Sequence, residues 1–263
     1  MDSKPQAADE LLQHPDLWSA QKLCDHEPLA HPSGFPALDE HLPGGGWPQA
    51  GLGELLLNTL GVGELRLLAP LLAKLSHSQE RWVAWVSPPF IPYAPALDAL
   101  GIDVSKMLLI HPKSHKEALW ALEQDSKSGT CSAVLAWLDE SQLKLKDTRR
   151  LQLAAKQGAT FTCLFRPQGA AEQNSMAELR LLIRSDSTAN AHELELCIHK
   201  RRRGWPIRGL RVSLPEALKP AAITEQLTLW RNMRQKPEQP VTPSPVEGFA
   251  RPTPVHSGSP MVH

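Results

Sequence analysis

Between residues 54 and 167 the chain alternates short apolar runs with longer segments of helical periodicity, and this alternation restricts the fold more than any other feature. The apolar runs contain few polar residues, which is typical of strands that are covered on both faces of a sheet. Strands separated by helices pair in parallel and carry those helices on the two faces. We expect strands at 54–57, 81–87, 106–112, 131–138 and 160–167, and helices at 64–75, 93–101, 114–129 and 146–158.

The pattern changes after the strand at 160–167, where three further strand-like runs follow one another with only turns between them. These runs cover 178–185, 192–200 and 210–215, and strands joined by turns pair antiparallel. The predicted fold class is therefore α/β, with a mostly parallel sheet flanked by helices and antiparallel strands on the C-terminal side. One core over 31–215 contains all of these elements, within the usual size of a domain.

The segments on either side of this core differ from it in composition. Residues 1–30 are predicted to be an N-terminal amphipathic arm, too short to be stable alone and therefore expected to dock on a partner or on its own core. The apolar residues of the arm are Leu11, Leu12, Trp18 and Leu23. A short C-terminal helix is predicted within 216–235, and the proline-rich tail at 236–263 is predicted to be disordered because it has almost nothing to bury.

The overall charge excludes a protein that is drawn to DNA or anionic lipid by its net field. The 28 Lys and Arg residues balance 28 Asp and Glu residues, so any nucleic-acid contact must be local. The four cysteines are far apart and do not indicate a disulfide framework. No secretory signal or membrane span is present in the sequence, so we expect a soluble cytoplasmic protein.

The loop that follows the strand at 54–57 has the position of a phosphate-binding loop but lacks its chemistry. It contains Gly61 and Gly63, whereas Glu64 and Leu65 stand where a working loop has Lys and Ser or Thr. A carboxylate at this position repels phosphate, and without the hydroxyl no side chain of the loop holds Mg²⁺. We interpret this as a degenerate P-loop and predict that the protein uses no nucleotide cofactor and does not hydrolyse ATP.

No other catalytic or metal site is predicted from the sequence. Asp139 and Glu140 follow the strand at 131–138 too late to serve as its metal ligands, and they are expected to cap the next loop. Besides His26 and His31, the close pair of histidines is His111 and His115, and we expect solvated loop histidines there because no H-E-x-x-H motif is present. A nucleophile elbow is also absent from the sequence, so we do not predict an enzyme.

Residues 199–211 contain six Lys and Arg residues, an unusual local concentration of positive charge in a protein with no net charge, and we call this segment the basic hairpin. Clustered arginines beside a tryptophan favour a contact surface for phosphate or for acidic protein groups. The alternatives are that the charges belong to a solvated turn and that the tryptophan packs beneath it. The candidate contact residues are Lys200, Arg201, Arg202, Arg203, Trp205, Arg208 and Arg211.

Several segments resemble the RecA core. PSGFPALDEHLPGGGWPQAGLGELL at residues 32–56 is similar to the segment that precedes the RecA P-loop strand, and the late strands ELRLLIR and LELCIHKRRRGWP are similar to the RecA strands that end in a short basic motif. GFPALDEHLPGGGWP, GELRLLAPLLA, RWVAWVSPP, RRLQLAA and LFRP, in this order, resemble most closely the ImuA family. Residues 64–183 also resemble SulA, a cell-division inhibitor with a RecA-like core and no P-loop.

The ImuA resemblance implies a non-catalytic accessory protein of SOS-induced mutagenic translesion synthesis. Its implied partners are RecA, an ImuB-type polymerase-like protein and, indirectly, an error-prone DNA polymerase, with DNA contact possible through the basic hairpin and no role for a membrane. By resemblance to RecA, Lys200 to Arg203 would lie at a subunit interface, and the arm would link to a partner. The alternative function is a SulA-like inhibitor that binds FtsZ and blocks its polymerisation.

Overall fold

The computed structural model describes residues 29–184, 192–202 and 204–214. Most of the predicted arm, the predicted helix within 216–235 and the tail lie outside the described residues, so the predictions made for them stay predictions. None of the helices in the described ranges combines the length and the apolar character that crossing a bilayer requires.

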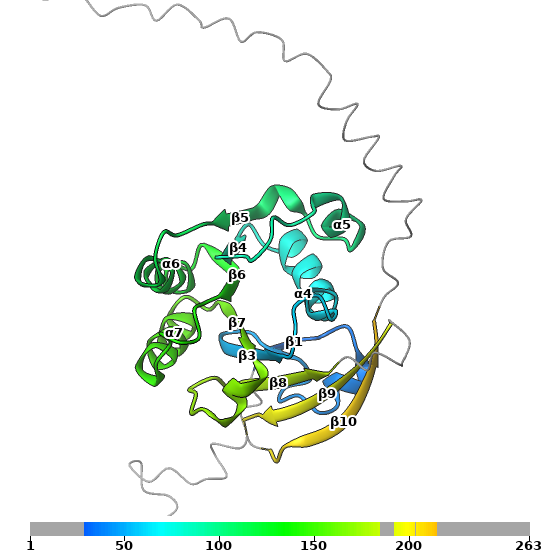
Figure 1. Ribbon diagram of the computed structural model, residues 1–263. Helices are drawn as coiled ribbons and strands as arrows, with labels where there is room; N and C mark the ends of the chain where they lie inside the picture. The colour runs from blue at the N-terminus through cyan, green and yellow to red at the C-terminus, as the bar shows by residue number, and fades with distance from the viewer. Residues whose placement is uncertain (1–28, 185–191, 203, 215–263) are drawn as a thin grey trace, which may run out of the picture.

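An eight-stranded sheet forms the centre of the molecule, with the strand order β10-β9-β8-β3-β7-β6-β4-β5 (Figure 1). Strands β3, β7, β6, β4 and β5 pair with their neighbours in parallel, as the alternation of strands and helices predicts. Their bounds are β3 (Gly51–Leu57), β4 (Trp82–Val86), β5 (Met107–Ile110), β6 (Cys131–Trp137) and β7 (Phe161–Pro167).

The remaining strands extend the sheet beyond β3. Strands β8 (Leu179–Arg184), β9 (Glu193–Lys200) and β10 (Ile207–Ser213) pair antiparallel with one another, which confirms that part of the prediction. Strand β8 is parallel to β3, however, because the chain crosses back through the 3-10 helix η2 (Gln168–Glu172) before it enters β8. The sheet is therefore parallel through β8 and antiparallel only at β9 and β10.

Helices cover both faces of the parallel part of the sheet. On one face lie α6 (His115–Ser128) and α7 (Leu145–Gln157), and on the other lies α4 (Glu64–Ser78), with α5 (Ala94–Ala99) towards the β5 edge (Figure 1). Short elements complete this fold, namely β1 (Ala30–His31), α3 (Pro36–Asp39), β2 (Trp47–Pro48) and the 3-10 helix η1 (Val104–Lys106).

The alternation of side chains along each strand separates two apolar cores. On β3, Leu55 and Leu57 pack in the core beneath α4, whereas Leu52 packs in the core beneath α6 and α7. Successive residues of a strand point to opposite faces, so a near-continuous apolar run fills both cores at once. Three of the strand cysteines are buried free thiols, as the sequence indicates, and they are Cys131, Cys163 and Cys197.

A buried carboxylate joins the three central strands on the α7 face. The Glu54 side chain, on β3, accepts hydrogen bonds from Arg166 on β7 (Nη1 to Oε1, 2.9 Å) and from Arg180 on β8 (Nε to Oε2, 2.7 Å). Ser175 also donates to Glu54. The three charged side chains are at most 4 % exposed, so these ion pairs are shielded from water.

The second carboxylate of this network comes from the loop after β6. Glu140 accepts from Nε and Nη2 of Arg166, at 2.9 and 2.5 Å, and a guanidinium held in two places by one carboxylate is oriented precisely. Burial alone lowers the pKa of a guanidinium, but the hydrogen bonds to Glu140 and the charge of Glu54 outweigh it and raise the pKa of Arg166. The remaining donors of Arg180 reach the backbone oxygens of Ala170, Ala171 and Gln173.

We predict that Glu54→Ala destabilises the fold by about 3–5 kcal/mol, because it leaves two buried guanidinium groups without their common counter-charge. The free energy of unfolding, measured by urea denaturation, tests this. Glu80→Ala is the matched control, since the Glu80 side chain is fully exposed and its loss should change stability by less than about 0.5 kcal/mol. Equal stability of the two variants would contradict the central role assigned to Glu54.

Candidate functional site

The loop between β3 and α4 is closed by its own carboxylate. The Glu64 side chain accepts hydrogen bonds from the backbone amides of Gly61 (2.8 Å) and Gly63 (3.0 Å). Backbone amides at the start of a helix are the groups that bind phosphate in nucleotide-binding loops. In this chain the first residue of the helix supplies the anion, and Glu64 is only 5 % exposed.

The other features of the loop agree with a closed arrangement. Gly63 has φ near +110°, and a side chain on it would meet Cδ1 of Leu214 at 2.6 Å, so glycine is required here for conformation and for space. Leu65 packs against the core beneath α4. The two non-glycine positions singled out in the sequence therefore serve the loop and the core.

The acidic residues after β6 are engaged in local structure. Hydrogen bonds from Ser141 and Gln142 lower the pKa of Asp139, which caps the loop as expected, and Glu140 binds Arg166. Among the described residues, no cluster of three or more His, Cys, Asp or Glu side chains is arranged to hold a metal ion. His111 lies in the loop after β5, whereas His115 is the first residue of α6.

The structure separates the cations of the basic hairpin. Lys200 donates to the backbone oxygen of Ser175 (2.9 Å), and Arg201 donates to the backbone oxygens of Trp205 and His41. Burial and the nearby charge of Arg180 lower the pKa of Lys200. Two of the six predicted cations thus donate hydrogen bonds to backbone oxygens of the protein body, Lys200 to Ser175 and Arg201 to His41.

The other described candidate contact residues of the hairpin have exposed side chains. Trp205 is 86 % exposed, so it does not pack beneath the turn, and Arg208 and Arg211 are exposed on the edge strand β10. Arg203 lies outside the described residues, as do Leu11, Leu12 and Trp18. Their roles in partner contact stay predictions.

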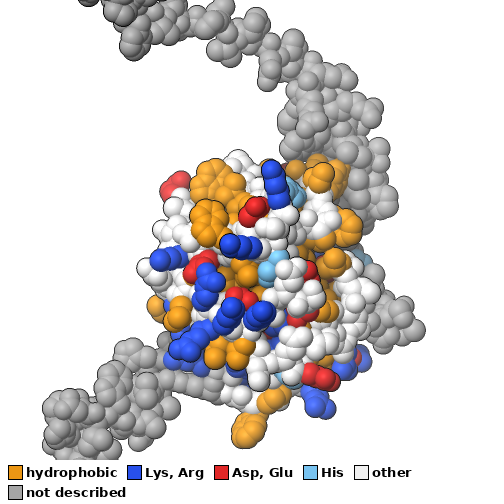
Figure 2. Space-filling view, turned by 60° about the vertical axis from the view of Figure 1, so that its left-hand side comes forward, with side chains coloured by type: hydrophobic (Ala, Val, Ile, Leu, Met, Phe, Trp, Pro, Cys, Tyr) orange, Lys and Arg blue, Asp and Glu red, His pale blue; other side chains and the backbone are white. Residues whose placement is uncertain are grey.

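A second concentration of basic residues occurs where sequence reading did not find one. Figure 2, in which the side of the molecule carrying α6 and α7 is turned forward, shows Lys and Arg side chains gathered on that face. The gathering was missed because two helices, separated by β6 in the chain, contribute to it. Lys116 of α6, Lys146 and Arg150 of α7, and Lys144 just before α7 line one hollow between the two helices.

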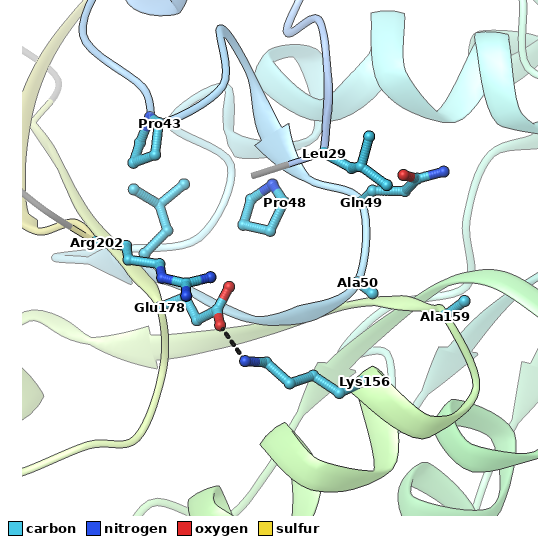
Figure 3. A pocket seen from close by; sticks show the side chains of 10 residues that line it. Leu29, Pro43, Pro48, Gln49, Ala50, Lys156, Ala159, Glu178 and Arg202 are labelled. Carbon is cyan, nitrogen blue, oxygen red and sulfur yellow. Dashed lines mark ion pairs between the residues drawn. The ribbon is translucent and has the colours of Figure 1, made fainter. Parts of the chain in front are cut away.

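A pocket of about 530 Å³ lies between the segment 43–50, the end of α7 and the start of β8 (Figure 3). Its walls include Pro48 and Leu179, and its charged groups are Lys156, Glu178 and Arg202. Nζ of Lys156 lies 2.7 Å from Oε1 of Glu178, so one positive charge is already neutralised. Arg202 of the basic hairpin is thus placed beside α7 and away from Arg208.

The largest exposed apolar side chains near the end of β4 form a further candidate surface, which we call the apolar edge. Phe90 and Ile91, in the loop that leaves β4, are 73 % and 85 % exposed. On the edge strand β5, Leu108 and Leu109 are about 40 % exposed, one on each face of the sheet. Tyr93, just before α5, is also exposed. Exposed apolar residues gathered in this way mark surfaces for protein contact.

The fold is that of an α/β protein with a largely parallel sheet and antiparallel strands at one edge. The sequence model of the family "Cell division inhibitor SulA" matches residues 58–162. A SulA from Edwardsiella piscicida is 34 % identical over 125 residues, which are 46 % of this chain and 71 % of that protein. The chain therefore belongs to the SulA family.

Other relatives agree. A SulA from Photorhabdus laumondii is 36 % identical over 115 residues, covering 44 % of this chain and 63 % of that protein, and a SulA from Serratia marcescens is 32 % identical over 117 residues, covering 44 % and 68 %. The crystal structure of SulA from Pseudomonas aeruginosa is 27 % identical and covers 44 % of this chain and 97 % of its own, with a TM-score of 0.37.

The predicted role as an ImuA-type accessory protein of translesion synthesis is wrong, because the relatives found are cell-division inhibitors. The preference for ImuA over SulA depended on the RecA-like segment before residue 53 and on the basic hairpin, and both lie outside the matched residues 58–162. The motifs GELRLLAPLLA, RWVAWVSPP and RRLQLAA lie inside the matched residues, where the chain also resembles SulA. The comparisons do not show the ImuA assignment, whereas they support the resemblance to SulA.

We predict that the protein does not bind Mg²⁺-ATP at micromolar concentrations, because the Glu64 carboxylate occupies the amides that a phosphate would need. Titration of a fluorescent ATP analogue measures this directly. Glu64→Gln, which removes the charge but keeps one acceptor, is the informative comparison. Tight binding by the unaltered protein, lost on Gly61→Ala, would contradict the closed loop.

Proposed function

We propose that the protein is a non-catalytic inhibitor of bacterial cell division, made in the SOS response, that binds FtsZ and blocks its polymerisation. Membership of the SulA family supports the inhibitory role, and FtsZ is the partner that the resemblance implies. The observation that carries the proposal is the position of the match, since residues 58–162 run from the loop after β3 to the start of β7. Every residue of the apolar edge lies inside this range.

The apolar edge has the physical properties of a protein-binding surface. Phe90, Ile91 and Tyr93 are large side chains on a loop held by the end of β4 and the start of α5, so little conformational freedom is lost when they are buried. Aromatic side chains that become fully desolvated in the centre of an interface contribute most of the binding energy. We therefore assign FtsZ contact to this edge of the sheet.

We also infer that the core is a RecA-like core whose P-loop has become degenerate. The order strand, glycine loop, helix at β3 and α4 supports this, together with the position of the loop at the carboxyl end of a central parallel strand. A loop closed by Glu64 cannot couple binding to a nucleotide cycle. Inhibition by such a protein depends on its concentration and affinity, as in simple mass action.

We predict that Phe90→Ser combined with Ile91→Ser abolishes the inhibition of FtsZ assembly. Each truncated central side chain is expected to cost about 2 kcal/mol, so the pair should weaken binding by at least about 100-fold. Sedimentation of FtsZ polymers formed with GTP, at increasing inhibitor concentrations, measures the effect. The melting temperature should not fall, because both side chains are exposed in the free protein.

Trp205→Ala is the matched control, since Trp205 is equally exposed but lies outside the family match. It should inhibit FtsZ assembly as the unaltered protein does. If Trp205→Ala loses inhibition while the Phe90 and Ile91 variant keeps it, the contact surface is assigned to the wrong edge. If the unaltered protein leaves FtsZ assembly unchanged, the proposed function itself is wrong.

We further predict that production of the protein in dividing bacteria gives filamentous cells, with normally segregated chromosomes, and that the Phe90 and Ile91 variant does not. Cell length measured by microscopy at matched protein levels tests this prediction. Normal division at levels that match or exceed those of FtsZ would contradict the proposed role.

A further inference from the structure

A hollow of about 500 Å³ lies between the N-terminal halves of α6 and α7, and we call it the α6–α7 groove. Its lining comes from two turns of each helix and from the loop that leads into α7. Helices α6 and α7 pack side by side on the sheet, so their exposed faces form the two walls (Figure 1). The residues on which the argument depends are His115, Lys116, Trp120, Lys144, Lys146 and Arg150.

Helical spacing places these side chains in matched pairs. Lys116 and Trp120 are four residues apart on α6, and Lys146 and Arg150 are four residues apart on α7, so each pair lies on one face of its helix. Lys144 precedes the first residue of α7 and adds a cation at the same end. Because α6 and α7 follow the parallel strands β5 and β6, this end of the groove lies at the carboxyl edge of the sheet, where α/β proteins commonly bind ligands.

The charges of the groove are largely unneutralised. Lys116, Lys144 and Lys146 are exposed, and among the described residues they form no ion pair, whereas Arg150 donates to Glu123. The acidic residue in the lining is Asp147, and its carboxylate is buried and accepts from the backbone amide of Lys144 (3.0 Å). The groove therefore concentrates positive charge on a protein whose formal net charge is zero.

Two further groups suit a ligand with both flat and polar parts. Trp120 is 64 % exposed at the groove, which leaves a large face of the indole in contact with solvent. Both ring nitrogens of His115 are buried without a hydrogen-bond partner in the described part of the chain. A groove with cations and an exposed aromatic face matches the requirements for single-stranded nucleic acid, in which phosphates alternate with stackable bases.

We propose that the α6–α7 groove binds single-stranded nucleic acid, with Lys116, Lys144 and Lys146 at the phosphates and Trp120 stacked on a base. Lysines bind phosphates as point charges, and the exposed Trp120 offers a stacking face that suits the bases of a nucleic acid and that an acidic peptide would leave unused. Arg150, the arginine in the lining, is already held by Glu123. The groove shares no lining residue with the apolar edge, so the two proposals are tested with different variants.

Fluorescence anisotropy of the full-length protein with a labelled oligothymidylate tests this proposal between about 50 and 200 mM salt. Three phosphate contacts predict a slope of log K against log salt of about −2, equivalent to a loss of roughly 20-fold over this range. Trp120→Ala should weaken binding about tenfold or more, through loss of stacking. Lys144→Ala with Lys146→Ala should reduce the slope to about −0.7, because one contact remains.

The controls use the other basic surface of the molecule. Trp205→Ala, and separately Arg208→Ala with Arg211→Ala, should leave both affinity and slope unchanged. All variants should keep the melting temperature of the unaltered protein, since the replaced side chains are exposed. A change in salt slope at unchanged melting temperature is an effect that a purely structural role of these lysines would not produce.

Three outcomes would overturn the proposal. The first is no binding of the oligonucleotide at the lowest salt concentration, and the second is binding that the hairpin variants weaken and the groove variants do not. The third is that a polyglutamate peptide binds the groove more tightly than the oligonucleotide, which would identify an acidic protein segment as its ligand. None of these outcomes affects the FtsZ proposal, which is measured without nucleic acid and with different variants.

Discussion

The buried pairing of Glu54 with Arg166 and Arg180 is the interaction on which the arrangement of the sheet most depends. Glu54 lies opposite Arg180 in the register of β3 and β8, and Arg166 reaches it from β7 on the other side. One carboxylate thus joins the central strand to both neighbours. Backbone pairing alone would tolerate a register shift, whereas a shift by one residue would turn each of these charges towards the wrong face. The network therefore fixes the alignment of β7, β3 and β8, the strands at which the parallel part of the sheet continues towards the antiparallel strands β9 and β10.

Strand β3, which carries Glu54, is followed by the loop that the Glu64 side chain closes. A phosphate loop is useful to a motor or a recombinase because ligand exchange changes its conformation, but an internal carboxylate cannot be exchanged. The loop of this chain is thus a fixed connection between β3 and α4.

The surfaces divide between two parts of the chain. The family match covers β4, β5, β6 and the helices between them, together with the apolar edge and the α6–α7 groove. The basic hairpin and strands β8 to β10 lie outside it. The ImuA prediction gave weight to the basic hairpin because its charges are consecutive in the sequence, but the hairpin lies outside the family match. Lys200 and Arg201, however, donate to the backbone oxygens of Ser175 and His41 in the body of the protein.

The sequence by itself determined the order of strands and helices, the parallel half of the sheet and the antiparallel pairing at its C-terminal side, because burial on two faces leaves a continuous apolar run and amphipathic helices leave a 3.6-residue period. It also indicated the loop at Gly61 and Gly63 and its unsuitable residues. Only the tertiary structure showed that the Glu64 side chain folds back on those glycines. It also showed that Glu54 pairs with two arginines more than a hundred residues away, and that lysines of α6 and of the start of α7 line one groove. The last two features arise from contacts between elements distant in the chain, and local periodicity does not predict which side chains such packing brings together.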